Sequence, residues 1–312
     1  MAGRVSIATA LLASTLTFGC SKGSSPPTTA VDTTAIRSSV DSMMRGHFAA
    51  FERGDLAGWT GIMADDVFLT AADPAEVFDS RDAALAELKR DFTPAFQAGL
   101  KLSVRPRASF VWVENNGRTA TATFDLDYTV SIANQTHPYR LRASYLLAGD
   151  TTGWQVLASQ YSRPVSYDSL FMALAQRRIP TPAAGTGAVL PSAGEIAEQF
   201  RRDIKDISKA NFASNAVVIT PGSIVQGAEA ASRELGQWMG PAGNVIEPRN
   251  ELRSQLTPSG TAGYVGTNLL IPVFAGPESL PAPMRALFVY RLGNNRWEIV
   301  QASLSVGLTD PS

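Results

Sequence analysis

Hydrophobic residues near the start of the chain recur at the spacing of an α-helix. One apolar stripe predicts a helix over about residues 32–54, with a buried face formed by Ile36, Val40, Met43, Met44, Phe48 and Phe51. Asp32 can cap its first turn, and Gly54 can take the left-handed conformation that ends a helix. A short second helix, capped by Asp55, is predicted from the apolar residues Leu56, Trp59, Ile62 and Met63.

A strand–turn–strand–helix pattern follows over residues 65–92 and returns over residues 214–239. The apolar residues of the first helix are Leu85, Leu88, Phe92 and Phe96. Those of the second helix are Ala231, Leu235 and Trp238. A unit repeated at this separation predicts two copies of one architecture in a single chain.

Segments with alternating apolar and polar residues follow the first copy. They predict strands over residues 100–113, 119–132, 137–147 and 154–161. In the second of these strands the apolar residues share one face, and Asp125 and Asp127 share the other. The register that keeps apolar faces together places both aspartates near Arg140 and Arg142 of the next strand. We therefore expect a sheet with one apolar face for the helices and one charged face.

The second half of the chain repeats this order with less charge. Its predicted elements are helices over 169–178 and 195–209 and strands over 245–256, 262–274, 283–292 and 297–304. The two halves end similarly, in GWQVLASQYS and RWEIVQASLS. Asn268 and Leu270 stand where the first copy has its aspartates, and Arg285 alone remains of the arginine pair. Pro272 and Pro283 predict sheet edges or bulges, because proline donates no ladder hydrogen bond.

Composition narrows the classes of function. The 312 residues are 45% hydrophobic and 18% charged, which suits two domains with buried cores. The formal net charge of -1 gives no reason to expect nucleic acid as a partner. Two histidines and one cysteine argue against a Cys/His metal site, and no motif indicates a cofactor.

The first twenty residues are typical of an export signal. Arg4 precedes an apolar run over residues 7–18, which is too short for a transmembrane helix, and Cys20 ends it. This arrangement resembles a bacterial lipoprotein signal in which Cys20 is lipidated, and residues 21–32 have the composition of a flexible tether. We therefore expect a lipid-anchored protein of the cell envelope, on the periplasmic face of the outer membrane in a Gram-negative cell. An ordinary secretory peptide is the alternative.

The order of elements resembles the nuclear transport factor 2-like (NTF2-like) fold over about Thr33 to Pro164. DPAEVFDSRDAALAEL and GWQVLASQYSRP are most similar to its SnoaL-like branch. The resemblance implies an α+β chain of two tandem cone-shaped domains, each a curved antiparallel sheet packed on about three helices. The expected division is a signal peptide (1–20), a tether (21–32), a first domain (33–165), a helix and linker (166–192) and a divergent second domain (193–308). Because members of this fold often pair sheet against sheet as separate subunits, the two domains could form a pseudo-dimer.

Enzymes of this fold use a carboxylate as general base in a pocket between helices and sheet. In the steroid-isomerase-like pattern it ends the first strand, before a proline. The nearest match here is Asp73–Pro74, and an Asp-Pro pair in a loop more often forms a turn. SnoaL-like sequences often have a histidine at the position of Gln160, whose amide cannot transfer a proton near neutral pH.

The remaining ionisable candidates allow two interpretations each. Asp127 with its neighbouring aspartate and arginines is superficially similar to the Asp-Arg-Asp arrangement of epoxide hydrolases of this fold. The favoured interpretation is a cross-strand ion-pair ladder on a solvated or interface face. His47 and His137 have no carboxylate at an obvious spacing, so we expect them to be structural or solvated. The first domain is thus expected to lack a proton-transfer group among its aromatic residues.

The remaining feature is a candidate pocket for a small apolar ligand. Its expected lining is Trp59, Met63, Phe92, Phe96, Tyr128, Tyr145 and Gln160. The same residues could simply fill the core. A non-catalytic role in ligand binding or protein interaction is favoured, and an isomerase, dehydratase or hydrolase in this pocket is the alternative.

Overall fold

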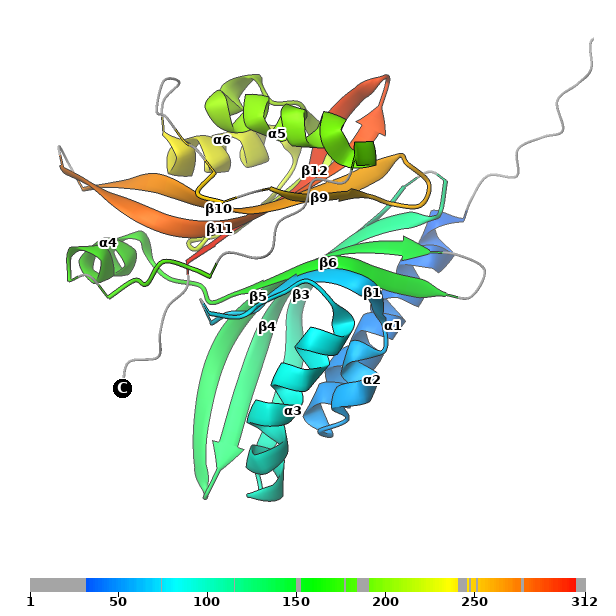
Figure 1. Cartoon of the computed structure of the whole chain (residues 1–312), viewed down its shortest axis with the longest axis vertical. Helices are drawn as coiled ribbons and strands as arrows, with labels where there is room; N and C mark the ends of the chain where they lie inside the picture. Colours follow the sequence, from blue (N-terminus) through cyan, green and yellow to red (C-terminus); the bar gives the residue numbers. More distant parts are fainter. Residues whose placement is uncertain are drawn as a thin grey trace, which may run out of the picture. The chain divides into compact units, whose positions relative to one another are not determined.

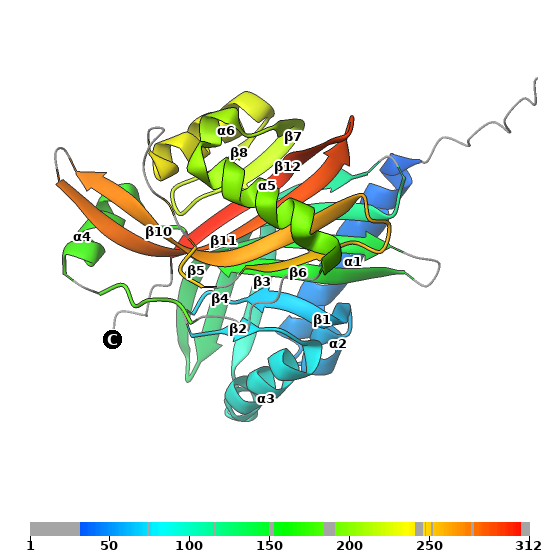
Figure 2. The same cartoon turned by 45° about the horizontal axis from the view of Figure 1, so that its top comes forward.

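The computed structural model places the strands of the chain in two six-stranded sheets, each with helices packed on it (Figures 1 and 2). The residues that the structure describes are 32–73, 75–114, 116–149, 153–176, 178–183, 191–240, 246, 248–250, 252–275 and 278–306. The expected signal peptide with Cys20 lies outside them, as does Pro74. No helix among these residues has both the length and the apolar character needed to cross a bilayer.

The first domain has the predicted order of elements. They are α1 (Thr33–Glu52), α2 (Leu56–Thr60), β1 (Met63–Thr70), β2 (Val77–Phe78), α3 (Arg81–Gln97), β3 (Lys101–Val113), β4 (Thr119–Ile132), β5 (Gln135–Gly149) and β6 (Trp154–Ser162). Both predicted caps are confirmed, because Asp32 accepts from the amides of Thr34 and Ala35, and Asp55 accepts from that of Gly58.

The strand order of the first sheet is β2-β1-β6-β5-β4-β3. We expected an antiparallel sheet. The observed sheet is mixed, because β1 pairs in parallel with β6. Parallel neighbours need a long connection, and here the chain passes through β2, α3 and the strands β3 to β5 before β6 returns beside β1.

The second domain repeats the same topology, with the order β8-β7-β12-β11-β10-β9. Its elements are η1 (Pro191–Ala193), α5 (Gly194–Lys205), η2 (Ile207–Lys209), β7 (Phe212–Ile219), β8 (Ile224–Gln226), α6 (Ala228–Met239), β9 (Arg253–Leu256), β10 (Ala262–Ala275), β11 (Glu278–Gly293) and β12 (Arg296–Val306). The helix α4 (Tyr167–Ala175) lies between the two sets of elements in sequence and packs on β10 and β11. Strand β9 is shorter than predicted.

The registers follow the hydrophobic patterns. Asp125 pairs with Arg142 and Asp127 with Arg140, as predicted from the apolar faces. In the second sheet β10 and β11 pair without a shift on either side of Pro272, so the predicted bulge is absent there. Strand β9 pairs with β10 only as far as Gly266, so Pro272 lies on a free edge within the described residues.

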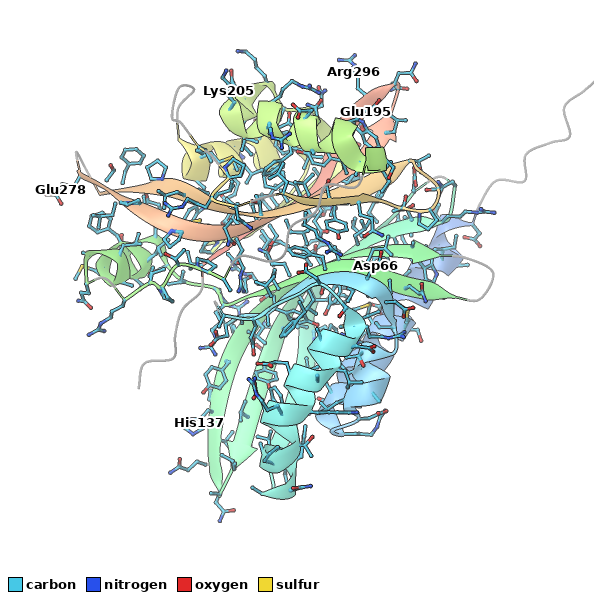
Figure 3. All side chains as sticks on the ribbon, viewed as in Figure 1. Asp66, His137, Glu195, Lys205, Glu278 and Arg296 are labelled. Carbon is cyan, nitrogen blue, oxygen red and sulfur yellow. The ribbon has the colours of Figure 1, made fainter. Side chains whose placement is uncertain are left out.

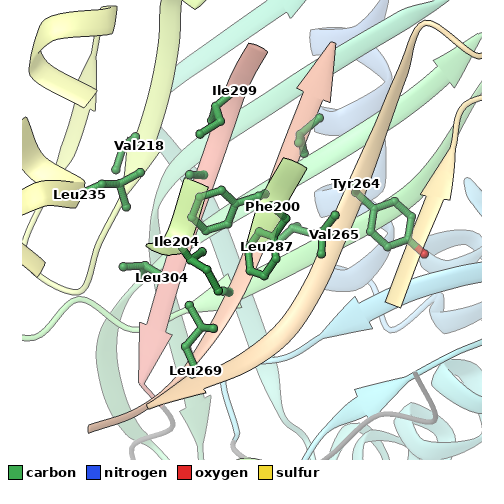
Figure 4. Packing of buried hydrophobic residues seen from close by; sticks show 14 of the residues in the cluster. Phe200, Ile204, Val218, Leu235, Tyr264, Val265, Leu269, Leu287, Ile299 and Leu304 are labelled. Carbon is green, nitrogen blue, oxygen red and sulfur yellow. The ribbon is translucent and has the colours of Figure 1, made fainter. Parts of the chain in front are cut away.

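Buried apolar side chains form two clusters. One lies wholly in the first domain, between its helices and the apolar face of its sheet. The other fills the second domain, where Phe200 and Ile204 of α5 pack over Leu287 and Leu304 of its sheet (Figure 4). This second cluster continues into the first domain through residues such as Phe68 of β1, whose ring stacks on Tyr264 of β10 at 5.8 Å between centroids.

Candidate functional site

A hydrogen-bonded chain lies inside the first domain, between its helices and its sheet. His47 on α1 has Nδ1 at 2.8 Å from the carbonyl oxygen of Trp59 and Nε2 at 3.3 Å from the hydroxyl of Tyr161 on β6. The Tyr161 hydroxyl lies 2.6 Å from that of Tyr145 on β5. The rings of His47 and Trp59 stack at 4.8 Å between centroids. A buried histidine therefore lies at the centre of an aromatic group.

The partners of His47 determine which of its nitrogens carries a hydrogen. A carbonyl oxygen can only accept, so Nδ1 donates to Trp59 and Nε2 accepts from the hydroxyl of Tyr161. The oxygen of Tyr161 then accepts from the hydroxyl of Tyr145. Burial lowers the pKa of His47 from 6.5 to about 3, and burial raises the pKa of both tyrosines. At neutral pH all three side chains are uncharged.

We expected His47 to be structural or solvated and did not place it among the aromatic residues, where it lies buried with both ring nitrogens hydrogen-bonded. A signal was present in the sequence, because His47 follows Met44 by three positions and precedes Phe51 by four on the apolar stripe of α1. Tyr161 was also missed. It alternates along β6 with Gln160, and the alternation alone does not tell which of the two faces the helices.

The expected pocket residues differ in how far their side chains are buried. Three are buried, namely Trp59, Met63 and Tyr145, and three are half-buried, namely Phe92, Phe96 and Tyr128. The half-buried pair on α3 packs toward the end of α1, where the ring of Phe92 lies 5.1 Å from that of Phe51. Of the residues in α3, only Ala84 is fully buried. The apolar stripe of this helix is thus only partly covered by the rest of the domain.

The second domain covers its corresponding helix completely. The apolar residues of α6 are buried, with Leu235 at 0% and Trp238 at 5% exposure. Its interior also holds a carboxylate that sequence reasoning did not identify. Asp203 on α5 accepts from Nε2 of Gln199 at 2.7 Å and from the hydroxyl of Tyr290 at 3.0 Å. Burial raises the pKa of Asp203 to about 6. Because each of its oxygens has a partner from its own domain, Asp203 acts as a part of the core.

The structure contradicts the placement of Gln160 in the pocket. Its Nε2 donates to the hydroxyls of Ser303 (3.0 Å) and Ser305 (3.1 Å) of β12. Gln160 pairs across the ladder with Ser144, while Tyr161 pairs with Ala143 and so faces the helices. Gln160 therefore belongs to the face of the first sheet that contacts the second sheet.

The charged candidates lie apart from the aromatic group. Asp127 is exposed and lies 3.8 Å from Arg107, and Arg140 forms an ion pair with Asp125. Arg142 is buried, and its guanidinium donates to carbonyl oxygens of residues 220–223, with the shortest contact to Thr220 at 2.5 Å. Of the two arginines in the predicted ion-pair ladder, Arg140 pairs with Asp125, whereas Arg142 binds the second domain.

Asp73 occupies a turn. It is exposed, and its Oδ1 accepts from the amide of Ala75 at 2.8 Å. The second histidine, His137, is exposed near the tip of the β4–β5 hairpin, in the part of β5 that does not pair with β6 (Figure 3). Among the described residues no cluster of three or more His, Cys, Asp or Glu side chains is suited to hold a metal ion.

Comparison with known proteins relates part of this chain to one family. The SnoaL-like domain family matches residues 40–166. An NTF2-like protein with a cystatin-like fold from Novosphingobium aromaticivorans is 15% identical over 42% of this chain and 83% of its own, with a TM-score of 0.37. A cystatin-like domain of unknown function from Nostoc punctiforme is 19% identical over 46% of this chain and 91% of its own (TM-score 0.37). A ketosteroid isomerase-like protein from Erwinia carotovora atroseptica is 17% identical over 42% of this chain and 97% of its own (TM-score 0.34).

Curated protein sequences gave no match. The solved structures each cover less than half of this chain. Residues 40–166 match the SnoaL-like domain family, and the second sheet of the chain repeats the strand order of the first.

Proposed function

We propose that the first domain binds a small, largely aromatic or apolar molecule between α3 and the apolar face of its sheet, and that it does so without catalysis. The observation that supports this is the difference between the two domains. The helix α6 buries its apolar stripe, whereas α3 leaves Phe92 and Phe96 partly exposed. Half-covered aromatic rings that lead inward to Trp59 and Tyr145 suit a ligand that completes the packing.

The group inside the first domain is better suited to structure than to proton transfer. A general base works best when its pKa lies near the working pH, and burial holds the pKa of His47 at about 3. Both of its nitrogens already have partners in Trp59 and Tyr161. The neutral chain fixes the ring of Trp59 at the inner end of the aromatic group.

One observation favours the alternative, an isomerase, dehydratase or hydrolase. The hydroxyl of Tyr145 reaches His47 through Tyr161, and such a relay could pass a proton if a substrate displaced one of its bonds. A catalytic role predicts turnover of a bound compound and its loss in Tyr145→Phe, with binding retained.

The proposal extends to the location of the protein. The sequence around Cys20 supports lipid attachment and a place in the bacterial envelope, with residues 21–32 as the tether. Retention in the membrane fraction, and its loss in Cys20→Ala, is the test. The second domain, whose interior is closed by its own side chains, is proposed to serve the first as a pseudo-dimer partner in the same chain.

Binding is tested with a thermal-shift screen of aromatic alcohols, ketones and acids and with the fluorescence of 8-anilinonaphthalene-1-sulfonate. Phe96→Ala should weaken binding of each hit about fivefold or more, since an aromatic contact contributes ~1 kcal/mol. Phe274→Ala is the matched control, because Phe274 is an exposed aromatic residue of β10 outside this domain. Binding that Phe96→Ala and Phe274→Ala weaken equally, or no binding by any compound, would overturn the proposal.

A further inference from the structure

The second domain contacts the segment that leads from β1 into α3. We define the β1–α3 segment as residues 66–73 and 75–79. At its start, Arg253 on β9 donates from Nη2 to the carbonyl oxygen of Asp66 at 3.0 Å. Gln255 on the same strand donates from Nε2 to Oδ2 of Asp66 at 2.9 Å. Asp66 lies on β1 (Figure 3).

A buried arginine holds the middle of the segment. Arg285 on β11 is 2% exposed, and its Nη1 donates to the carbonyl oxygen of Ala71 at 2.5 Å. A guanidinium in such a place needs acceptors, because a buried charge without hydrogen bonds is costly. The turn after β1 supplies one of them, so its position is coupled to the second sheet.

The end of the segment is held by an ion pair. Nη1 of Arg253 lies 3.2 Å from Oδ1 of Asp79, and both side chains are mostly buried, at 16% and 23% exposure. The next residue, Ser80, caps α3, because its Oγ accepts from the amide of Ala83 at 3.2 Å. Arg253 therefore reaches from the second domain to the residue just before the first turn of α3.

The helix that follows is only partly covered by its own domain, through contacts such as those of Leu88 and Phe92. Only Ala84 of α3 is fully buried, and Pro94 interrupts the backbone hydrogen bonds near its C-terminal end. Helices with few buried contacts open at low free energy and depend on their attachments. At its N-terminal end α3 is attached through the β1–α3 segment and through Arg81, which forms an ion pair with Asp65 and donates to the carbonyl oxygen of Met63.

We propose that the second domain is a positioning domain for α3, with Arg253 as its principal positioning residue and Arg285 as its support. By holding the β1–α3 segment at Asp66, Ala71 and Asp79, it sets where α3 stands and hence how far Phe92 and Phe96 lie open. The consequence for ligand affinity rests on the proposed function, whereas the control of α3 itself does not.

The reverse contact does not have the same effect. Arg142 of the first domain donates to the carbonyl oxygens of the turn after β7, at the position equivalent to Ala71. The helix that follows that turn is α6, whose Leu235 and Trp238 are buried in their own domain. Packing already fixes α6, so the dependence runs from the second domain to the first.

Hydrogen–deuterium exchange of the full-length protein tests the positioning. In Arg253→Gln the amides of residues 84–97 should exchange about tenfold faster than in the wild type, which corresponds to ~1.4 kcal/mol. Amides of α6 should be unchanged. Asp79→Asn removes the same ion pair from the first domain and should give the same pattern.

Arg291→Gln is the matched control. Arg291 also crosses between the domains, with its guanidinium 5.2 Å from the ring of Trp112, but it contacts no residue of the β1–α3 segment among the interactions described. Exchange in α3 that is as slow in Arg253→Gln as in Arg291→Gln would overturn the proposal. So would equal acceleration throughout the chain, which would indicate a general loss of stability.

A binding measurement separates this inference from the function on which its consequence rests. For a compound found in the screen, Arg253→Gln should change the dissociation constant at least threefold, and Arg291→Gln should leave it unchanged. If no compound binds while α3 exchanges faster in Arg253→Gln, the proposed function fails and the positioning stands. If a compound binds equally well to both variants and α3 exchange is unaltered, the positioning fails alone.

Discussion

Replacement of His47 by glutamine should remove a pH dependence of stability that this one side chain creates. Glutamine can donate to the carbonyl oxygen of Trp59 and accept from Tyr161, but it cannot be protonated. In the wild type the pKa of His47 is about 3 in the fold and 6.5 in the unfolded chain. At pH 7.5 and above the imidazole is largely neutral in both states and contributes little pH dependence.

Below pH 6.5 the unfolded chain takes up a proton that the fold excludes, so the free energy of unfolding falls as the pH falls. The loss from this group is ~1.4 kcal/mol for each pH unit, which gives ~2 kcal/mol at pH 5 and an upper limit of ~5 kcal/mol near pH 3. At pH 7.5 the variant should be less stable than the wild type by ~1–2 kcal/mol, because the stacking of His47 on Trp59 is lost. The two stability curves should therefore approach each other near pH 5.

Urea unfolding followed by tryptophan fluorescence between pH 5 and 7.5 measures both curves. His137→Gln is the matched control, because it removes the exposed histidine, leaves His47 in place and should retain the wild-type dependence. Parallel curves for the wild type and His47→Gln would refute the reasoning. An NMR titration in which the His47 imidazole is protonated near pH 6.5 in the folded protein would refute it directly.

Two further predictions concern the second domain and the contact between the sheets. Asp203→Asn should raise the free energy of unfolding by about 1–3 kcal/mol at pH 7.5 but not at pH 4. The reason is that a carboxyl with a folded-state pKa of about 6 costs stability as the pH rises from 4 to 6. Urea unfolding at the two pH values measures this difference, and destabilisation of the variant at both pH values would contradict the prediction. Gly266→Ala should lower the free energy of unfolding by about 1–3 kcal/mol, since its Cβ would lie 2.2 Å from Cε1 of Phe68 in the stack on Tyr264. Gly46→Ala in α1, where nothing lies within 4 Å, is the control and should be neutral or stabilising; equal effects of the two changes would exclude the close approach of Phe68.

The sequence determined the elements, their repetition and their registers. Helical and alternating periods depend on local backbone geometry, so α1 and the β4–β5 ladder could be predicted from residue spacing alone. The same alternation predicted that Asp125 would meet Arg142. Most of the aromatic group around Trp59 and Tyr145 was predicted as well, because its members share the apolar faces.

Tertiary structure decided which elements pack on each face of a strand or helix. The spacing of apolar residues along the sequence does not contain this information. Gln160 and Tyr161 are neighbours on one strand and point to opposite faces of the sheet. The helices cover the face of Tyr161, whose hydroxyl lies in the core, and the second sheet covers the face of Gln160, whose amide lies at the interface. His47 became a buried, neutral acceptor because Trp59 and Tyr161 come from distant parts of the chain. Helices α3 and α6 have similar apolar stripes in sequence, and only the fold covers one and leaves the other half open, because burial depends on neighbours that lie far away along the chain.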